Sequence, residues 1–180
     1  GGCSDSGGMS MRVLVTGGAG YIGSHVILTL AEAGHAVTVL DNLSTGHAWA
    51  VGAGRLVTGD ILDGPLLDRL FAAERFDAVL HLAAESVSSD SVSEPLRYYR
   101  SNVVGTQLLL DACRRHKPRY LVFSSSAAVY GAPKRLPVSE RAALAPINPY
   151  GATKAMGERM LQDHCAVAEL RAVSLRFFNV

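Results

Sequence analysis

Tyr150 and Lys154 are four residues apart where a helix is expected, and this pair could carry out proton chemistry. That spacing places both side chains on one face of a helix, one turn apart. An isolated phenol is protonated at neutral pH, but a neighbouring positive charge favours the phenolate, which makes Tyr150 a candidate general base. A Tyr-x-x-x-Lys pair also occurs by chance as an exposed helix pair, so its meaning depends on the elements around it.

A run of serines, Ser124 to Ser126, closes the predicted strand that precedes this helix. In a doubly wound parallel sheet the carboxyl ends of the strands converge on the ligand crevice. A serine there can hold a substrate hydroxyl and share its proton with Tyr150. The alternative interpretation is a solvated strand end.

A glycine-rich turn directly follows the first predicted strand and is typical of a dinucleotide site. Gly17 would allow the sharp turn, and Gly20 would let the backbone approach a pyrophosphate. Gly23 would let the next helix pack closely while its N-terminus faces the phosphates. A plain strand-to-helix turn is the alternative, but three glycines at this spacing favour the dinucleotide site.

Two aspartates follow later predicted strands. Asp41 comes eighteen residues after Gly23, where an acidic residue is expected to bind ribose hydroxyls. A carboxylate there repels a 2′-phosphate, so NAD is favoured over NADP; Asp41 could also cap its turn. Asp60 is expected near the adenine edge, with a simple turn residue as the alternative. His81 is expected to be a hydrogen-bonded structural histidine rather than a base or ligand.

The hydrophobic pattern alternates between short β-branched runs and longer helical periods, which predicts an α/β fold with a doubly wound, Rossmann-type parallel sheet and helices on both faces. About six strands are expected, at 12–16, 36–40, 55–59, 77–82, 120–124 and 172–177. Helices are expected near 22–33, 65–74, 95–116 and 149–170, the last with Asn148 as its N-cap.

The composition limits the class of protein. Lys and Arg number 17 against 16 Asp and Glu, which argues against a charge-driven nucleic-acid binder, and 48% of the residues are apolar, which favours a packed core. No apolar run is long enough for a membrane helix, so a soluble, cytoplasmic protein is expected. Cys3, Cys113 and Cys165 are expected to be reduced thiols, and no metal site is expected.

Several motifs together resemble the extended short-chain dehydrogenase/reductase family, and within it the UDP-glucose (UDP-galactose) 4-epimerase group. They are VLVTGGAGYIGSH (13–25), VLDNLSTG (39–46), GDI (59–61), HLAA (81–84), YYRSNVVGT (98–106), FSSSAAVYG (123–131), NPYGATKAMGE (148–158) and RFFNV (176–180). This set covers nearly everything from Met11 onward and is much more specific than any single motif.

The resemblance implies roles for individual residues. Ser126 would be the catalytic serine, Tyr150 the base, and Lys154 its modulator and a ligand of the nicotinamide ribose. Asn179 would contact the nucleotide sugar together with Ser126 and Tyr150. Besides Tyr150, Lys154 and the three glycines of the turn, the residues lining NAD would be Tyr21, Ile22, Asp41, Asn42, Leu43, Ser44, Thr45, Gly46, Asp60, Ile61, the segment 82–86 (Leu82, Ala83, Ala84, Glu85 and Ser86), Asn102 and Phe178.

The implied reaction is transient oxidation at C4 of a UDP-sugar, rotation of the keto sugar and return of the hydride to its other face. Dehydratases of the family carry a Thr-Asp-Glu set where this chain has Ser126-Ala127-Ala128, so hydride transfer alone is favoured. One departure is Ser86, where members of the group often carry a lysine toward the pyrophosphate.

The domain organisation expected from this resemblance is a Gly/Ser-rich tail or tag remnant at 1–10 and an NAD-binding Rossmann domain at 11–180, without the C-terminal substrate domain of the family. We therefore expect the chain to bind NAD with little turnover. Dimerisation through the helices 95–116 and 149–170 is also implied. Two alternatives stay open: another extended dehydrogenase/reductase acting on nucleotide sugars (a uronate epimerase, dehydratase, decarboxylating relative or reductase), and a non-catalytic NAD-binding module.

Overall fold

A six-stranded, fully parallel sheet forms the centre of the molecule in a computed structural model that describes residues 9–178. The strand order is β3-β2-β1-β4-β5-β6, so the order reverses between β1 and β4, where doubly wound sheets open their ligand crevice. The strands are β1 (Arg12–Thr16), β2 (Ala36–Asp41), β3 (Arg55–Thr58), β4 (Ala78–His81), β5 (Tyr120–Ser126) and β6 (Arg171–Phe177). The predicted fold class is confirmed.

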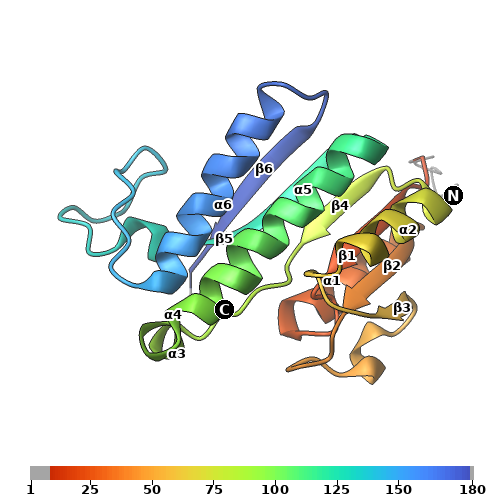
Figure 1. The fold of residues 1–180 in the computed structure, drawn as a ribbon, viewed down its shortest axis with the longest axis horizontal. Coiled ribbons are helices and arrows are strands. Elements are labelled where there is room, and N and C mark those ends of the chain that lie inside the picture. Colours follow the sequence, from red (N-terminus) through yellow and green to blue (C-terminus); the bar gives the residue numbers. More distant parts are fainter. Residues whose placement is uncertain (1–8, 179–180) are drawn as a thin grey trace, which may run out of the picture.

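Helices cover both faces of this sheet (Figure 1). The α-helices are α1 (Tyr21–Glu32), α2 (Gly64–Glu74), α3 (Ser88–Ser93), α4 (Pro95–Tyr98), α5 (Gly105–His116) and α6 (Pro149–Cys165). Short 3-10 segments form η1 (Ala48–Val51) and η3 (Ala127–Tyr130), and a π-helical segment forms η2 (Tyr99–Val104). Helices α2, α5 and α6 lie side by side on one face.

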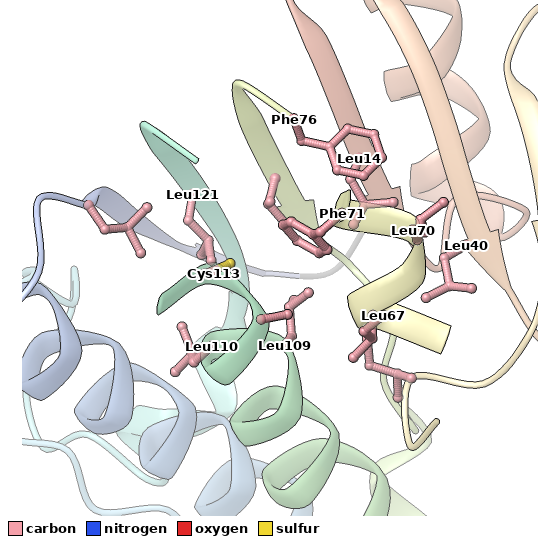
Figure 2. Packing of buried hydrophobic residues seen from close by; sticks show 14 of the residues in the cluster. Leu14, Leu40, Leu67, Leu70, Phe71, Phe76, Leu109, Leu110, Cys113 and Leu121 are labelled. Atoms are coloured by element: carbon pink, nitrogen blue, oxygen red, sulfur yellow. The ribbon is translucent and has the colours of Figure 1, made fainter. Parts of the chain in front are cut away.

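The alternation of side chains along the strands divides the core into two layers. Leu14 and Leu40 point toward α2 and α5, where they join Phe71 and Leu109 in the larger cluster (Figure 2). The neighbouring valines of β1 and β2 point to the opposite face and pack with Ile27 of α1. Because both faces of the strands are covered, their sequences are almost continuously apolar.

The predicted helix 95–116 is interrupted in the structure. A π-helical turn separates α4 from α5, and the N–H of Gly105 bonds to the carbonyl of Arg100, five residues back. The buried Asn102 sits inside this turn, and its side chain bonds outward to two other segments. Hydrophobic periodicity does not reveal such a wide turn, nor the short helix α3 that precedes it.

Helix α6 is shorter than predicted. It ends at Cys165 instead of continuing to residue 170, because the chain turns at Ala166 and Val167 to start β6 at Arg171. Arg171 pairs with Tyr120 in the parallel register of β5 and β6. The start of α6 is as predicted: the side chain of Asn148 accepts a hydrogen bond from the N–H of Gly151, and Pro149 occupies the first turn.

The described residues contain no helix that is both long and apolar enough to cross a membrane. Of the expected tail 1–10, residues 1–8 lie outside the described range and residues 9 and 10 are exposed. Cys3 lies outside it too, whereas Cys113 and Cys165 are free thiols, as expected. Burial raises the pKa of Cys113 to about 12, so this thiol is unreactive at neutral pH.

Candidate active site

One cavity of about 410 Å³ runs along the carboxyl ends of the strands and joins the glycine turn to Tyr150. Its volume lies in the range of small-molecule sites. Most residues predicted from the sequence line it, namely Gly17, Gly20, Tyr21, Ile22, Gly23, Asp41, Asn42, Ser44, Thr45, Asp60, Ile61, Leu82, Ala83, Ala84, Ser86, Ser126, Tyr150, Lys154 and Phe178. Residues that are far apart in the sequence therefore share one site.

Three predicted residues do not line this cavity. Leu43 packs against the core on the α1 side, Gly46 lies against Ala19, and Asn102 is only 3% exposed. Asn179 lies outside the described residues. Glu85, from the predicted segment 82–86, lines the cavity too. Sequence reasoning gave no individual role to several other lining residues: Leu40, Gly59, Val87, Ser101, Ser124, Ser125 and Phe177. Most of these adjoin a selected residue in the sequence, so the motifs locate the site more reliably than its individual contacts.

The chain itself requires glycine at two of the three glycine positions of the turn. Gly17 has φ +70°, and a Cβ there would lie 2.5 Å from the backbone N of Ala83. A Cβ on Gly23 would lie 2.5 Å from the Cα of Gly18, so α1 packs against the turn itself. A Cβ on Gly20 would meet only the carbonyl oxygen of Gly17, at 3.5 Å. The backbone of Gly20 is extended, with a φ of −81° that any residue can adopt. Neither strain nor packing within the chain requires glycine at position 20.

The N-terminus of α1 opens on the cavity with Gly20 as its N-cap, and no side chain caps it. The first-turn N–H groups of a helix lack intrahelical partners, and the helix dipole makes this end favourable for an anion. The carboxylate of Asp41 is fixed beside this end because it accepts hydrogen bonds from the N–H groups of Ala19 (2.9 Å) and Leu43 (2.8 Å). Asp41 thus holds its own turn and faces the cavity at once.

Asp60 is similarly fixed at the same end of the cavity. It accepts a hydrogen bond from the side-chain amide of Asn42 at 2.9 Å and from the N–H of Leu62 at 2.8 Å. This contact joins the loop after β2 to the loop after β3, so the two loops form one wall.

At the opposite end, Lys154 is held beneath the phenol ring of Tyr150. The ammonium of Lys154 donates a 2.7 Å hydrogen bond to the carbonyl of Ser124 and lies 5.9 Å from the centre of the Tyr150 ring. Burial lowers the pKa of Lys154 to about 8. Ser126 ends β5 and its Oγ accepts a 3.2 Å hydrogen bond from the N–H of Ala128. The predicted catalytic residues therefore come from β5 and α6, where these two elements meet.

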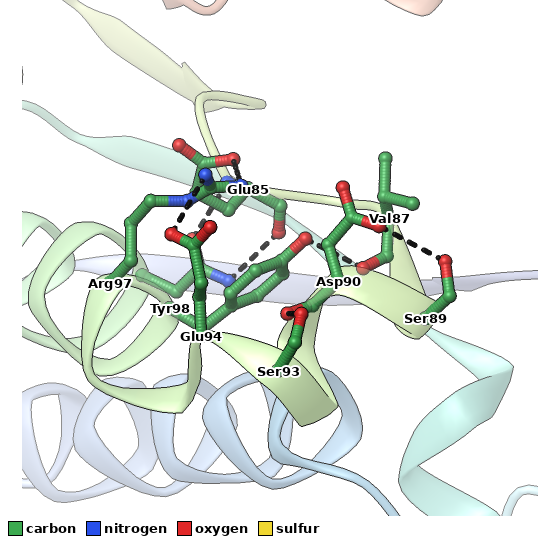
Figure 3. A network of polar contacts seen from close by, with 9 residues as sticks. Glu85, Val87, Ser89, Asp90, Ser93, Glu94, Arg97 and Tyr98 are labelled. Atoms are coloured by element: carbon green, nitrogen blue, oxygen red, sulfur yellow. Dashed lines mark hydrogen bonds and ion pairs between the residues drawn. The ribbon is translucent and has the colours of Figure 1, made fainter.

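The cavity lining carries an uneven set of charges. Lys154 is the single cation among the described lining residues, whereas Asp41, Asp60 and Glu85 supply carboxylates. No lysine stands at position 86, and Glu85 bonds to Arg97 at 3.3 Å, outside the lining (Figure 3). The N-terminus of α1 would therefore be the main group that stabilises the negative charge of a phosphate ligand.

The loop 82–87 is tied to the helices behind it. Asn102 accepts a hydrogen bond from the N–H of Glu85 and donates to its carbonyl, and it also donates to Thr153 on α6. The hydroxyl of Tyr98 donates to the carbonyl of Val87 at 2.6 Å, a contact visible in Figure 3. Asn102 thus connects a wall of the cavity to the helix that carries Tyr150.

His81 is the structural histidine that the sequence predicts. Thr106 donates its hydroxyl proton to the carbonyl of Asn102, so its oxygen must accept from Nε2 of His81. Nδ1 then accepts from Thr16 at 2.8 Å. Burial, with a smaller effect of Lys154, lowers the pKa of His81 to about 3, so the ring is neutral. Within residues 9–178 no cluster of potential metal ligands occurs.

The chain is similar to known proteins along almost its whole length. The model of the "NAD dependent epimerase/dehydratase family" matches residues 13–180. A UDP-glucose 4-epimerase of Azospirillum brasilense is 51% identical over 178 residues, which are 98% of this chain and 51% of the relative. A UDP-glucose 4-epimerase of Halalkalibacterium halodurans is 47% identical over 94% of this chain and 51% of the relative.

Solved structures agree with these relatives. The UDP-glucose 4-epimerase of Brucella ovis in complex with NAD has a TM-score of 0.92 and 51% identity over 94% of this chain and 52% of that structure. The enzyme of Thermotoga maritima with UDP-glucose has a TM-score of 0.90 and 36% identity over 92% of this chain and 55% of that structure. The chain spans about half the length of the relatives it matches.

Proposed function

Because the chain belongs to the NAD dependent epimerase/dehydratase family, we propose that it is the NAD-binding and catalytic part of a nucleotide-sugar 4-epimerase of the UDP-glucose/UDP-galactose type. The observation that carries this proposal is the cavity that runs from the glycine turn to Ser126, Tyr150 and Lys154. A dinucleotide whose pyrophosphate binds at the N-terminus of α1 would extend along this cavity to the proton-transfer residues at the far end.

The residues of the cavity fit NAD. Position 20 leaves open the space that a Cβ would occupy, next to the uncapped N-terminus of α1, where a pyrophosphate is favoured. Asp41 would accept the ribose hydroxyls and repel the 2′-phosphate of NADP, and Asp60 would lie toward the adenine. Lys154 would hold the nicotinamide ribose. Bound NAD supplies reversible hydride acceptance.

The chain's own residues would move the proton. Tyr150 would take the proton of the sugar hydroxyl as the carbon is oxidised, and would give it back on reduction. The ammonium of Lys154, 5.9 Å from the ring centre, would stabilise the negative charge on Tyr150. Ser126 would hydrogen-bond the reacting oxygen of the sugar and orient it.

The rest of the residues at this end favour hydride transfer without elimination. Ala127 and Ala128 follow Ser126 in η3 and offer no acid or base group. A dehydratase would need additional acid and base side chains there, as its Thr-Asp-Glu set supplies. An epimerase only needs the proton acceptor that Tyr150 provides.

The partners belong to the same proposal. A UDP-sugar would be the substrate, with Asn179 among its contacts, and a homodimer would form through the helices of 95–116 and α6. We also propose a cytoplasmic location, where nucleotide sugars and NAD are both available. The 180-residue chain itself would bind NAD with little turnover.

The experiment that tests this function uses the whole gene product. It is incubated with UDP-galactose and NAD, and formation of UDP-glucose is followed in a coupled assay. We expect conversion by the parent and almost none by Tyr150→Phe, with NAD binding retained by both proteins. Absence of conversion, or equal rates for the two, would refute the epimerase proposal.

A further inference from the structure

The buried carboxylate of Glu158 lies behind the catalytic residues and has no part in the reaction described above. It is 2% exposed, and it does not line the cavity. Glu158 is four residues after Lys154, which is four residues after Tyr150, so the three side chains form a row on one face of α6. The third member of this row is therefore placed to act on the other two.

Glu158 accepts hydrogen bonds from two strands at once. Ser125 of β5 donates its hydroxyl proton at 2.5 Å, and Arg176 of β6 donates from Nε at 2.8 Å and from the second guanidinium nitrogen at 2.7 Å. Arg176 also donates to the Tyr130 hydroxyl at 2.7 Å and to the Glu140 carbonyl at 3.0 Å. The Glu158 carboxylate thus connects α6 to both strands, and its partner Arg176 extends the cluster to η3 and the segment after it.

The charge of Glu158 is compensated within this cluster. Burial by itself would raise the pKa of Glu158, but hydrogen bonds from Arg176 and Ser125 outweigh it and hold that pKa below its usual value. The same contact raises the pKa of Arg176. A buried ion pair adds little net stability because desolvation costs about as much as the attraction gains. The main effect of the Glu158–Arg176 pair is therefore to fix the positions of α6, β5 and β6 relative to one another.

That geometry bears on the site because Ser125 lies between two functional groups. The carbonyl of the residue before it, Ser124, holds the ammonium of Lys154, and the residue after it is Ser126. Helix α6 also lies very close to β5: a Cβ on Gly157 would be 2.5 Å from Cζ of Phe123. The hydrogen bond from Ser125 to Glu158 fixes the position of the end of β5 relative to α6.

From these contacts we infer that Glu158 is a positioning residue: together with Arg176 it anchors Ser125, and thereby holds the Ser124 carbonyl and Ser126 in place relative to Lys154 and Tyr150. The assignment rests on the proposed function for its catalytic meaning. Its structural content, the placement of Lys154 by Glu158 through Ser125, stands without any ligand.

The test observes Lys154 directly. The chain contains three lysines, so incorporation of lysine labelled with ¹³C at Cε gives three NMR signals to titrate against pH. Among the described residues, Tyr150, the neutral His81 and Glu158, one turn further along α6, are titratable groups near Lys154. Tyr150 and His81 stay unchanged in every variant, and Glu158 stays unchanged in Ser125→Ala. The variants are Glu158→Gln and Ser125→Ala, and the second removes the anchor without changing any charge. The spectra are recorded without nucleotide.

The matched control is Asp163→Asn, which makes the same carboxylate-to-amide change on the same helix. Asp163 pairs with Arg159 on the exposed side of α6, away from the site. We expect Asp163→Asn to leave the Lys154 titration unchanged. Glu158→Gln and Ser125→Ala should lower its midpoint by about half a pH unit, the effect of weakening one hydrogen bond to the ammonium. The signals of Lys117 and Lys134 should not move.

A Lys154 titration in folded Ser125→Ala that superimposes on the parent would overturn the inference, and this variant decides the matter if Glu158→Gln does not fold. A change of equal size in Asp163→Asn would overturn it as well. Addition of NAD afterwards separates the two proposals. If NAD leaves the Lys154 signal of the parent unmoved, the proposed function fails, whereas a shift caused by Ser125→Ala still supports the positioning role.

Discussion

The ammonium of Lys154 donates a 2.7 Å hydrogen bond to the carbonyl of Ser124, and this contact joins α6 to the end of β5 at the candidate active site. Lys154 is only 4% exposed and has no carboxylate partner among the described residues. The chain therefore buries an uncompensated positive charge beside Tyr150. Such a cost is expected where a charge serves function.

Replacement of Lys154 by Met should stabilise the fold. Burial lowers the pKa of Lys154 from 10.5 to about 8, so below pH 8 the folded state holds a charge that the unfolded state accommodates better. Between about pH 8 and 10.5, Lys154 is protonated in the unfolded chain but deprotonated in the folded protein. The parent should therefore gain stability as the pH rises through this range. We expect Lys154→Met to be about 1 to 3 kcal/mol more stable at pH 7.

Urea unfolding of both proteins at several pH values measures this difference. The advantage of Lys154→Met should shrink as the pH rises above 8. A variant that is less stable than the parent at pH 7, or a difference that does not change with pH, would show that the buried ammonium carries no penalty.

Substitutions at Gly20 and Gly23 should separate binding from folding. A Cβ at position 20 meets only one backbone oxygen at 3.5 Å, so Gly20→Ala should change stability by less than about 1 kcal/mol. Its Cβ would enter the space proposed for the pyrophosphate, and we expect NAD affinity to fall at least roughly tenfold, or about 1.4 kcal/mol.

Gly23→Ala is the matched counterpart, because its Cβ would lie 2.5 Å from the Cα of Gly18. We expect a loss of about 1 to 3 kcal/mol in unfolding free energy from this overpacking. Thermal unfolding and fluorescence titration with NAD provide both readouts. Unchanged NAD affinity in Gly20→Ala would show that the glycine turn is not the pyrophosphate site.

A lysine at position 86 should strengthen NAD binding. Ser86 lines the cavity, and Lys154 at its far end is the one cation among the described lining residues. Ser86→Lys would place a positive charge near the pyrophosphate, and we expect affinity to rise up to about fivefold, as for a partly exposed ion pair. Ser86→Gln is the control for side-chain size. Equal affinities of the two variants would contradict this electrostatic explanation.

The neutral state of His81 should make the fold sensitive to acid. Its folded pKa of about 3 lies below the ordinary 6.5, so below pH 6.5 the unfolded state binds a proton that the folded state excludes. Stability is therefore lost as the pH falls, by about 1.4 kcal/mol for each pH unit from this residue.

His81→Gln should remove this slope between pH 5 and 6, although it lowers stability at pH 7 by breaking the bonds to Thr16 and Thr106. Urea unfolding of parent and variant over this pH range gives the two slopes. Equal slopes would mean that His81 is protonated in the folded protein.

The sequence predicted those parts of the molecule that depend on local patterns. The strands follow from apolar runs, and the roles of Gly17 and Asn148 follow from the turn and the cap that they form. Such local patterns could not predict the contacts between segments that are far apart in the sequence. Asn102 was assigned to the cofactor from its motif, yet it joins the loop 82–87 to Thr153 from within a π-helical turn.

Glu158 illustrates the same limit. A glutamate in the middle of an amphipathic helix has no distinctive sequence signal. Its partners Ser125 and Arg176 come from two strands, and they meet only because residues 125 and 176 are paired in the parallel register of β5 and β6. The motifs located the site, while the packing that supports it required the structure.

The central claim is that a hydride leaves C4 of the sugar and returns to the same carbon within one site. The most direct measurement uses the whole gene product and UDP-galactose that carries deuterium at C4, in ordinary water. We predict UDP-glucose that retains the deuterium at C4, because the hydride acceptor stays in the cavity and does not exchange with solvent. Product in which hydrogen from water has replaced the deuterium would contradict the account.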